Sequence, residues 1–270
     1  MNASFMSPII QAEVKRLRSL HTGKGRRNHK QFLAEGVRLL EESIRHGFLP
    51  LEVYYSEALL SERGSKLVDR FGKLRVSINK ISARDIGRIC ETDTSQGIAA
   101  LFELPELPLS GRADNSLKSI LYLDNISDPG NAGTLIRSAA AFGFNLVVFS
   151  PDSVEPYNSK VVRSSAGSVF KIVPKVGAVK NLLQYIKNSG YSFIAADISG
   201  DSPEAIVKRV DINKIVLVAI GSEGEGLSSD IKRNSTDRVC VGFENSVESL
   251  NASVAGSIIM RTIYESRRRI

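Results

Sequence analysis

The stretch from residue 214 to 255 constrains the fold of this 270-residue chain more than any other part. It begins with an apolar, β-branched run at residues 215–220 that ends at Gly221. Such a run bounded by glycine is typical of a strand buried on both faces. A second short strand is predicted at residues 238–241, and residues 249–251 begin a predicted final helix. Two strand ends and a helix start would then meet at one edge of a sheet, where open α/β sheets bind ligands.

The glycine-rich segment that follows the first of these strands limits which ligand is plausible. Its spacing is G-x-x-G-x-G, which is neither the dinucleotide-binding pattern nor a P-loop. Glycine allows tight turns and lets backbone amides approach a ligand closely. The two acids in the segment, Glu223 and Glu225, would repel a pyrophosphate. We therefore favour a neutral or cationic ligand, and a glycine-rich hairpin without a ligand is the alternative.

Composition and charge point to a globular protein with a polyanionic partner. Hydrophobic residues make up 42% of the chain and charged residues 24%, which suits a protein with real cores. The net charge of +7 and the pI of about 9.4 favour a polyanionic partner, with a merely basic protein as the alternative.

The cysteines and histidines predict free thiols and no metal site. Cys90 and Cys240 lie far apart beside apolar residues, and the three histidines form no ligand spacing with them. No apolar run is long enough for a membrane span, and the N-terminus lacks a signal-peptide core. We expect a cytoplasmic protein with no membrane partner, and a form in an organelle is the alternative.

Four segments are predicted along the chain. Residues 1–30 form a basic N-terminal extension, and residues 31–104 alternate helix and strand as a small α/β domain in which 31–36 lead into a helix. Residues 105–118, with two prolines, form a linker. In residues 119–270 strands alternate with helices, which predicts a mainly parallel sheet covered by helices on both faces.

Three local expectations concern this second domain. Asn131 is predicted to cap a helix over residues 132–142, and residues 169–173 are predicted to form a strand. The last helix is predicted over residues 251–268. Its buried side is expected to contain Val254, Ile258, Ile259 and Ile263.

Basic residues in two places are candidates for RNA contact. Arg26, Arg27 and Lys30 lie in a segment without apolar residues, which favours contact with phosphates, although a solvated tail is the alternative. Arg163 begins a segment that either faces RNA or simply connects two elements.

Three polar segments in the second domain carry the chemistry. They are residues 128–133 followed by Arg137, residues 221–228, and residues 249–253. In this order, at the carboxyl ends of predicted strands, they resemble the three motifs of the SpoU (TrmH) family of RNA ribose 2′-O-methyltransferases, which belongs to the SPOUT class. The resemblance covers residues 119–268. Residues 31–104 resemble, more loosely, the ribosomal-protein-like substrate-binding domain of that family.

This resemblance implies a fold, a cofactor and a partner. It implies a trefoil knot in which residues 220–268 pass through a loop, S-adenosylmethionine as the methyl donor, and a homodimer with its site near the interface. The positions that match the cofactor contacts are Gly221, Val241 and Leu250, to which we add Ser222 and Gly226 of the same loop. The positions that match the polar catalytic set are Asn131, Arg137, Glu223, Ser249 and Asn251.

The residue types agree with methyl transfer. Transfer from a sulfonium to a hydroxyl depends mainly on in-line positioning and requires no metal. A sulfonium donor also tolerates the acidic glycine loop. A guanidinium stays protonated at its ordinary pKa. Arg137 therefore either orients the ribose and a phosphate by charge-assisted bonds, or takes part in proton removal if a second cation lies close.

Ribosomal RNA is the favoured substrate, because many transfer-RNA members of the family lack a separate N-terminal domain. Transfer RNA is the nearest alternative. A non-catalytic RNA-binding dimer on the same fold is a second alternative, which the intact motif residues disfavour. A Rossmann oxidoreductase would require an early G-x-G-x-x-G, which this sequence lacks.

Overall fold

The structure is a computed structural model, and it describes residues 11–268 except 110, 112, 114–115 and 245–248. The chain folds into two compact units. The first contains residues 1–105 together with 157–170, and the second contains residues 106–156 together with 171–270. A short segment from the second half of the sequence therefore belongs to the first unit.

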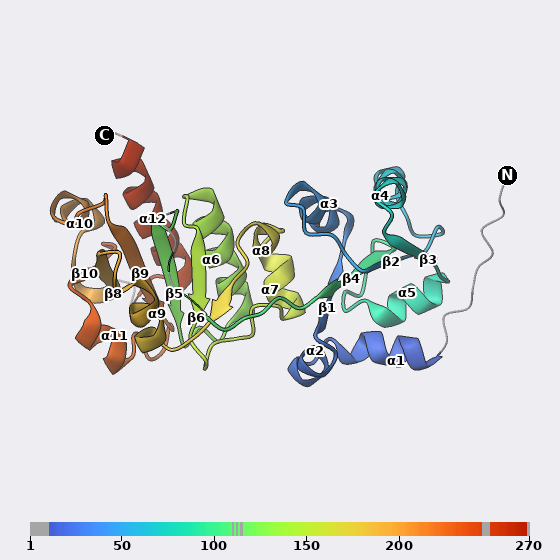
Figure 1. Ribbon diagram of the computed structural model, residues 1–270, viewed down its shortest axis with the longest axis horizontal. Helices are drawn as coiled ribbons and strands as arrows, with labels where there is room; N and C mark the ends of the chain where they lie inside the picture. Colours follow the sequence, from blue (N-terminus) through green and yellow to red (C-terminus); the bar gives the residue numbers. More distant parts are fainter. Residues whose placement is uncertain (1–10, 110, 112, 114–115, 245–248, 269–270) are drawn as a thin grey trace. The chain divides into compact units, whose positions relative to one another are not determined.

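The first unit is built on a mixed four-stranded sheet (Figure 1). Its order is β1-β4-β2-β3, with β4 antiparallel to both β1 and β2, and β3 parallel to β2. The strands are β1 (Gln31–Glu35), β2 (Glu52–Tyr55), β3 (Ser77–Lys80) and β4 (Ile98–Glu103). The sequence did not predict β1. It forms because all five of its residues pair with β4, which no local pattern reveals.

Helices cover both faces of this sheet. The helices of the unit are α1 (Gln11–Ser19), α2 (Gly23–His29), α3 (Val37–Arg45), α4 (Glu62–Lys73), α5 (Ala83–Ile89), α7 (Ser159–Ser164) and α8 (Ser168–Lys171). Val14 and Leu17 of α1 pack with Ile86 of α5 onto Tyr54 and Leu101 of the sheet. The basic residues 11–30 are therefore part of this unit and not a solvated tail. The strand predicted at residues 169–173 is wrong, because α8 occupies most of that range.

The second unit is a six-stranded sheet of parallel strands in the order β10-β8-β9-β5-β6-β7. The strands are β5 (Ser119–Asp124), β6 (Leu146–Phe149), β7 (Lys175–Val176), β8 (Tyr191–Asp201), β9 (Ile215–Gly221) and β10 (Asp237–Val239). The central strand β9 is buried from Ile215 to Ile220, as its apolar run predicts. The predicted parallel α/β sheet is confirmed, and the trefoil knot stays a prediction.

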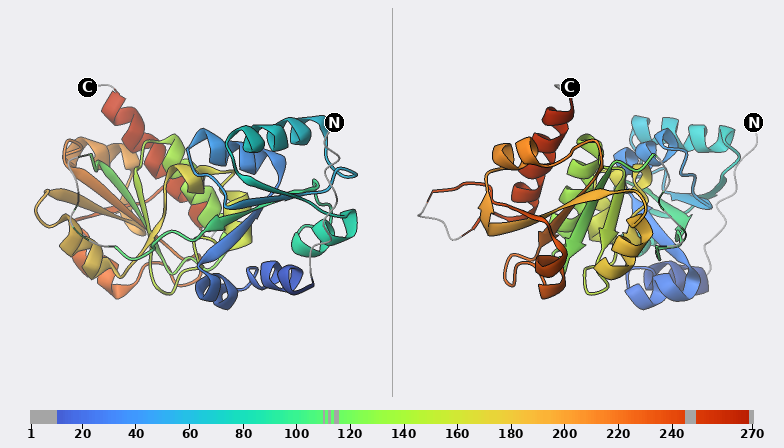
Figure 2. Two further views of the ribbon diagram at one scale, coloured as in Figure 1. Left: turned by 45° about the vertical axis from the view of Figure 1, so that its right-hand side comes forward. Right: turned by 60° about the vertical axis from the view of Figure 1, so that its left-hand side comes forward.

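Two groups of helices sandwich this second sheet (Figures 1 and 2). The helices are α6 (Pro129–Ala141), α9 (Val179–Ile186), α10 (Pro203–Arg209), α11 (Ser229–Asn234) and α12 (Ala252–Arg268). Helices α6, α10 and α12 pack together on one side, and side chains of α9 and α11 fill the other. Within the described part of the chain, no helix is both long enough and apolar enough to span a bilayer.

Two local expectations are corrected at the helices that carry motifs. The N-cap of α6 is Asp128, not Asn131, and Pro129 takes the first helical position that proline favours. In α12, Ile259 and Ile263 are buried as predicted, but Val254 is 48% exposed and Ile258 is 38% exposed. The apolar stripe of α12 is therefore wider than the packing of one chain requires.

Candidate active site

The glycine loop at the end of β9 forms a tight turn. Ser222 and Gly226 form an isolated antiparallel β-bridge, in which the backbone N–H of Gly226 donates to the Ser222 carbonyl at 3.0 Å. Gly226 has φ of +67°, and a Cβ at Gly221 would lie 2.4 Å from the backbone of Gly226. Position 226 therefore requires glycine for its backbone conformation, and position 221 requires it because the backbone of Gly226 lies so close.

A buried carboxylate fixes the far end of this loop. Asp124, at the carboxyl end of β5, is only 3% exposed. Its Oδ2 accepts a hydrogen bond of 2.7 Å from the backbone N–H of Ser228. Sequence analysis missed this residue. The available signal was an acid placed directly after a buried strand and shortly before the first motif.

One carboxylate joins the three motifs. Glu223 Oε1, in the glycine loop, accepts hydrogen bonds from Asn131 Nδ2 at 3.1 Å and from Asn251 Nδ2 at 2.5 Å. Asn251 Nδ2 also lies 2.9 Å from Asn131 Oδ1. These side chains come from the start of α6, the end of β9 and the residue before α12. The structure therefore brings together three of the five predicted catalytic residues.

Asn251 has a second role at the start of α12. Its Oδ1 accepts hydrogen bonds from the backbone N–H groups of Ser253 at 3.0 Å and Val254 at 3.2 Å, which is how a capping residue acts. The Glu223 carboxylate also lies 3.4 Å from the backbone nitrogen of Ala252. A negative charge at this helix end is favourable, because the N–H groups there lack intrahelical partners.

A cavity of about 720 Å³ opens beside the glycine loop. This volume suits a ligand of cofactor size. All five predicted cofactor-contact residues line it: Gly221, Ser222, Gly226, Val241 and Leu250. Ser249 lines the cavity as well. The apolar part of the cavity wall includes Ile220, Leu227 and Ile259.

Charged side chains of both signs line the same cavity. Asp197 comes from β8, Arg238 from β10 and Lys232 from α11. Hydrogen bonds from the side chain and backbone of Ser199 lower the pKa of Asp197. The sequence did not predict these residues, because nothing in their local pattern shows that these three elements meet at the loop.

A second cavity, of about 420 Å³, lies against the same loop. It shares residues 222–225 of the glycine loop and Ala252 with the first cavity, and its other lining residues, among them Asn125 and Asn131, lie between β5 and the first turn of α6. The glycine loop is therefore a common wall of the two cavities.

Two predicted catalytic residues lie outside the three-residue cluster. Ser249 is exposed at the first cavity. Arg137 is exposed on α6, six residues after Asn131, and lines neither cavity. Among the residues that the structure describes, its guanidinium has no hydrogen-bond or ion-pair partner. It is therefore accessible to a ligand from outside this chain.

The residues predicted to contact RNA occupy different environments. Arg26 is only 3% exposed, and its Nη1 donates to the carbonyls of Leu20 and His21, each at 3.0 Å. We correct its assignment to a structural one, because a buried guanidinium cannot reach a phosphate. Arg27 and Lys30 are exposed.

Arg163 has a structural contact that the sequence did not predict. It forms ion pairs with Glu35 and Glu91, each at 3.0 Å, while its side chain is 31% exposed, and its contact with RNA stays a prediction. Metal ligands were not expected. Within the described residues, no three His, Cys, Asp or Glu side chains are grouped so that they could hold a metal ion.

Known proteins resemble this chain over most of its length. A model of the SpoU rRNA Methylase family matches residues 118–261, and a model of the MRM3-like substrate binding domain matches residues 11–100. A protein of Synechocystis sp. named as an uncharacterized tRNA/rRNA methyltransferase is 31% identical over 259 residues, covering 95% of this chain and 90% of that protein.

A characterised relative and a solved structure extend the comparison. The 23S rRNA (guanosine(2553)-2′-O)-methyltransferase RlmP of Bacillus subtilis is 27% identical over 248 residues, covering 92% of this chain and 94% of that protein. The crystal structure of the SpoU methyltransferase AviRb from Streptomyces viridochromogenes, in complex with the cofactor AdoMet, has a TM-score of 0.82 at 23% identity. It covers 96% of this chain and 100% of AviRb, so the two proteins share their fold.

Proposed function

Because this chain belongs to the SpoU rRNA Methylase family, we propose that it transfers a methyl group from S-adenosylmethionine to a ribose 2′-hydroxyl of structured RNA, with ribosomal RNA as the favoured substrate. The observation that carries this proposal is the junction of Asn131, Glu223 and Asn251 beside a cavity of cofactor size. The names of RlmP and AviRb support it.

The first cavity fits S-adenosylmethionine in size and in chemistry. Its apolar wall and the glycine backbone suit an adenine ring, and groups of both charge signs suit an amino acid. Asp197 would pair with the ammonium of the ligand, and Lys232 or Arg238 with its carboxylate. When bound, the cofactor supplies the electrophilic methyl group. Gly221, Val241 and Leu250 would hold the adenosine part, together with Ser222 and Gly226.

The polar residues would position the ribose. Glu223 holds both asparagines in one arrangement, which keeps the glycine loop fixed against α6 and α12. Arg137 lies exposed on α6 and would orient the ribose and an adjacent phosphate by charge-assisted hydrogen bonds. Ser249, exposed at the cavity, would accept or relay a hydrogen bond from the sugar.

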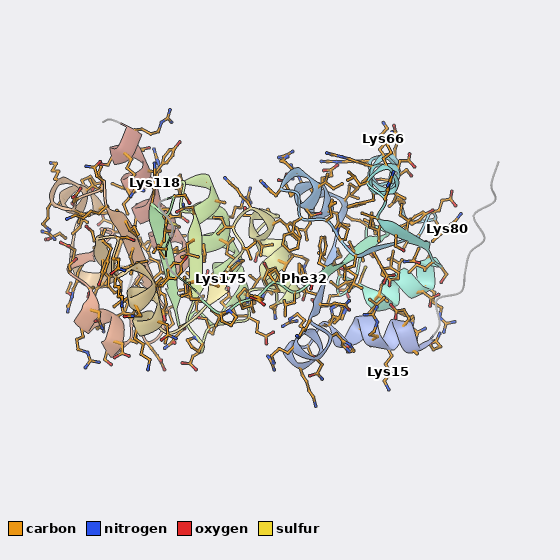
Figure 3. All side chains as sticks on the ribbon, in the orientation of Figure 1. Lys15, Phe32, Lys66, Lys80, Lys118 and Lys175 are labelled. Atoms are coloured by element: carbon orange, nitrogen blue, oxygen red, sulfur yellow. The ribbon has the colours of Figure 1, made fainter. Side chains whose placement is uncertain are left out.

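The first unit would bind the RNA. Helix α1 buries its apolar side and exposes basic residues on the other, and Lys15 projects from α1 away from the strands (Figure 3). Helix α2 has no apolar side but also exposes basic residues. The exposed basic residues of the two helices and of the residue that follows them are Lys15, Arg18, Lys24, Arg27 and Lys30. Such a surface contacts phosphates without reading sequence, which suits folded RNA.

A homodimer is part of this proposal. Val254 and Ile258 are large apolar side chains left exposed on α12. The same helix contributes Ala255 and Ile259 to the wall of the first cavity. A second copy packed on this side of α12 would bury the exposed residues and lie close to the cofactor.

Mapping 2′-O-methylated nucleotides in RNA from a strain that lacks this protein tests the function. We expect one ribosomal RNA position to lose its methyl group and to regain it with the wild-type protein but not with Arg137→Ala. Loss confined to transfer RNA would correct the substrate. An unchanged map, together with no methyl transfer by the purified protein to total RNA, would support the non-catalytic RNA-binding alternative.

A further inference from the structure

Residues 157–170 follow β6 in the sequence but fold into the first unit. They contain α7 and most of α8, and three kinds of contact hold them there. The first is aromatic. Tyr157 lies 4.5 Å from the ring of Phe32, and Phe170 lies 5.2 Å from Phe102 and 5.3 Å from Phe48, as measured between ring centroids.

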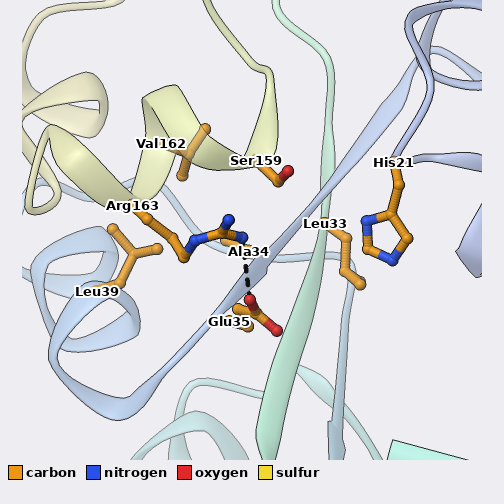
Figure 4. A pocket seen from close by; sticks show the side chains of 8 residues that line it. All are labelled: His21, Leu33, Ala34, Glu35, Leu39, Ser159, Val162 and Arg163. Atoms are coloured by element: carbon orange, nitrogen blue, oxygen red, sulfur yellow. Dashed lines mark hydrogen bonds and ion pairs between the residues drawn. The ribbon is translucent and has the colours of Figure 1, made fainter. Parts of the chain in front are cut away.

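The second contact is an ion network around Arg163, of which Figure 4 draws the pair with Glu35. Its Nη1 lies 3.0 Å from Glu35 Oε1 and 3.0 Å from Glu91 Oε2. The Ser159 hydroxyl donates to Glu91, and His21 Nδ1 lies 3.6 Å from the other oxygen of that carboxylate. The side chain of Glu35 is only 10% exposed, so without Arg163 a largely buried charge would lose its partner.

The third contact is a close approach of backbone to side chain. Gly167 has φ of +89°, and a Cβ placed there would lie 2.4 Å from Cβ of Glu42 on α3. No side chain fits at this position unless the segment moves away from α3. The segment is therefore fitted to the first unit by shape as well as by charge.

The chain just before this segment holds a wall of the second cavity. The backbone N–H of Asn125 donates to Ser150 Oγ at 2.9 Å, and that of Ile126 donates to Ser153 Oγ at 3.0 Å. Ser153 Oγ in turn donates to the carbonyl of Leu123 at 3.0 Å. Ser153 is four residues before Tyr157. A short stretch of chain therefore connects the loop that leads to Asn131 with a segment fastened in the first unit.

We propose that residues 157–170 are an anchor through which the first unit positions the β5–α6 loop, with Arg163 and Gly167 as positioning residues. The proposal rests on the proposed function, because it assigns RNA to the first unit and the chemistry to the second. Release of the anchor would free the chain at residues 150–156, and with it the β5–α6 loop that Ser150 and Ser153 hold. A misplacement of about 1 Å can cost roughly 100-fold in rate even when its cause is remote from the chemistry.

Two substitutions in the full-length protein test the anchor, each with a matched control in the same unit. Gly167→Ala is compared with Gly47→Ala, because Gly47 has φ of +69° but a Cβ added there would meet no atom within 4 Å. Arg163→Ala is compared with Arg63→Ala, which breaks an exposed ion pair to Glu41. We expect both anchor variants to lower kcat for RNA methylation about 10- to 100-fold. The Kd for S-adenosylmethionine should stay within about twofold, and both controls should match the wild type.

Arg163→Lys keeps the charge and should recover part of the kcat that Arg163→Ala loses, which a purely steric role would not allow. If Arg163→Ala does not fold, Arg163→Lys is compared with the wild type instead. Equal kcat values in these two proteins would then refute the need for a guanidinium that contacts both Glu35 and Glu91. Anchor variants that match their controls in kcat would overturn the proposal.

Hydrogen–deuterium exchange gives a readout that does not require methylation. In both anchor variants, peptides covering residues 121–131 and 150–170 should exchange at least about threefold faster than in the wild type and the controls, because locally opened segments lose protection. Faster exchange in 157–170 alone would overturn the coupling to the loop. If the wild-type protein methylates no RNA, the proposed function fails, whereas the exchange result still decides the anchor.

Discussion

The side-chain nitrogen of Asn251 lies 2.5 Å from a carboxylate oxygen of Glu223, and the same oxygen accepts a hydrogen bond from Asn131. One carboxylate therefore fixes the positions of two asparagines, one in the first turn of α6 and the other directly before α12. A charge-assisted hydrogen bond is stronger than a neutral one, so this arrangement favours a single geometry of the loop between the two cavities.

Replacing Glu223 by alanine should loosen that geometry. The two asparagine amides would lose their shared acceptor, and hydrogen bonds to charged groups contribute about 1.5–3 kcal/mol each. We expect at least roughly tenfold weaker binding of S-adenosylmethionine and slower methyl transfer, measured by calorimetry and by transfer of labelled methyl groups. Glu225→Ala is the control, because the carboxylate of Glu225 has no partner among the described residues. Equal losses in both variants would contradict a specific role for Glu223.

Arg137→Ala should leave the fold and the dimer intact, because the side chain is exposed and contributes to no apolar contact of α6. Methylation should fall at least about 100-fold, as when a single positioned donor is lost from an active site. Arg137→Lys should fail as well if planar, two-pronged contact is required. Circular dichroism and size-exclusion chromatography control for folding and assembly. A folded alanine variant with near wild-type turnover would refute the assignment.

Neutralising the basic side of α1 and α2 should weaken RNA binding and flatten its salt dependence. Each phosphate contact contributes about 0.7–0.9 to the magnitude of the slope of log affinity against log salt. Replacing Lys15, Arg18, Lys24 and Lys30 by glutamine should therefore lower the magnitude of that slope by about 3 if all four contact RNA. Filter binding at several salt concentrations measures this. A control variant replaces two basic residues of the same unit, Lys66 and Lys80, which are paired with Glu62 and Glu57. A slope equal to that of the wild type would place the RNA elsewhere.

Tyr157→Phe should stabilise the protein. Tyr157 is 1% exposed, and its hydroxyl oxygen has no hydrogen-bond partner within the described part of the chain. A buried, unsatisfied polar group costs about 1–3 kcal/mol, so we expect a gain of about 1 kcal/mol in the free energy of unfolding. Urea denaturation measures it. Tyr122→Phe should instead lower the free energy of unfolding, because the Tyr122 hydroxyl donates to the Gly177 carbonyl at 3.2 Å. Destabilisation by Tyr157→Phe would mean that the hydroxyl is satisfied in solution.

The two cysteines should differ sharply in reactivity. Burial raises the pKa of the Cys90 thiol to about 12, so only about one molecule in 10⁴ carries the thiolate at about pH 8. Cys240 is half-buried and lines the first cavity. Iodoacetamide should therefore modify Cys240 first, S-adenosylmethionine should slow that reaction, and Cys240→Ser should abolish the fast phase. Mass spectrometry locates the label. Fast labelling of Cys90, or no protection by the ligand, would contradict the cavity assignment.

The sequence by itself determined the parallel sheet and the identity of the three motifs. The run from Ile215 to Ile220 is apolar at every position, as a strand covered on both faces must be, and the glycine spacing after it excludes the phosphate-binding loops. These features are local, because each depends on residues adjacent in the chain. The glycines at 221 and 226 could be placed for the same reason, since a tight turn requires them wherever the rest of the chain lies.

Contacts between residues distant in the chain could be decided only by the tertiary structure. Strand β1 exists because it pairs with β4, which lies far along the chain, and Arg26 is buried because backbone carbonyls of a neighbouring turn surround its guanidinium. Asp124 meets Ser228 across 104 residues. Arg163 meets Glu35 across 128 residues, in a unit to which its place in the sequence did not assign it. Burial and pairing of charges depend on which surfaces meet in three dimensions, and no periodicity along a single segment carries that information.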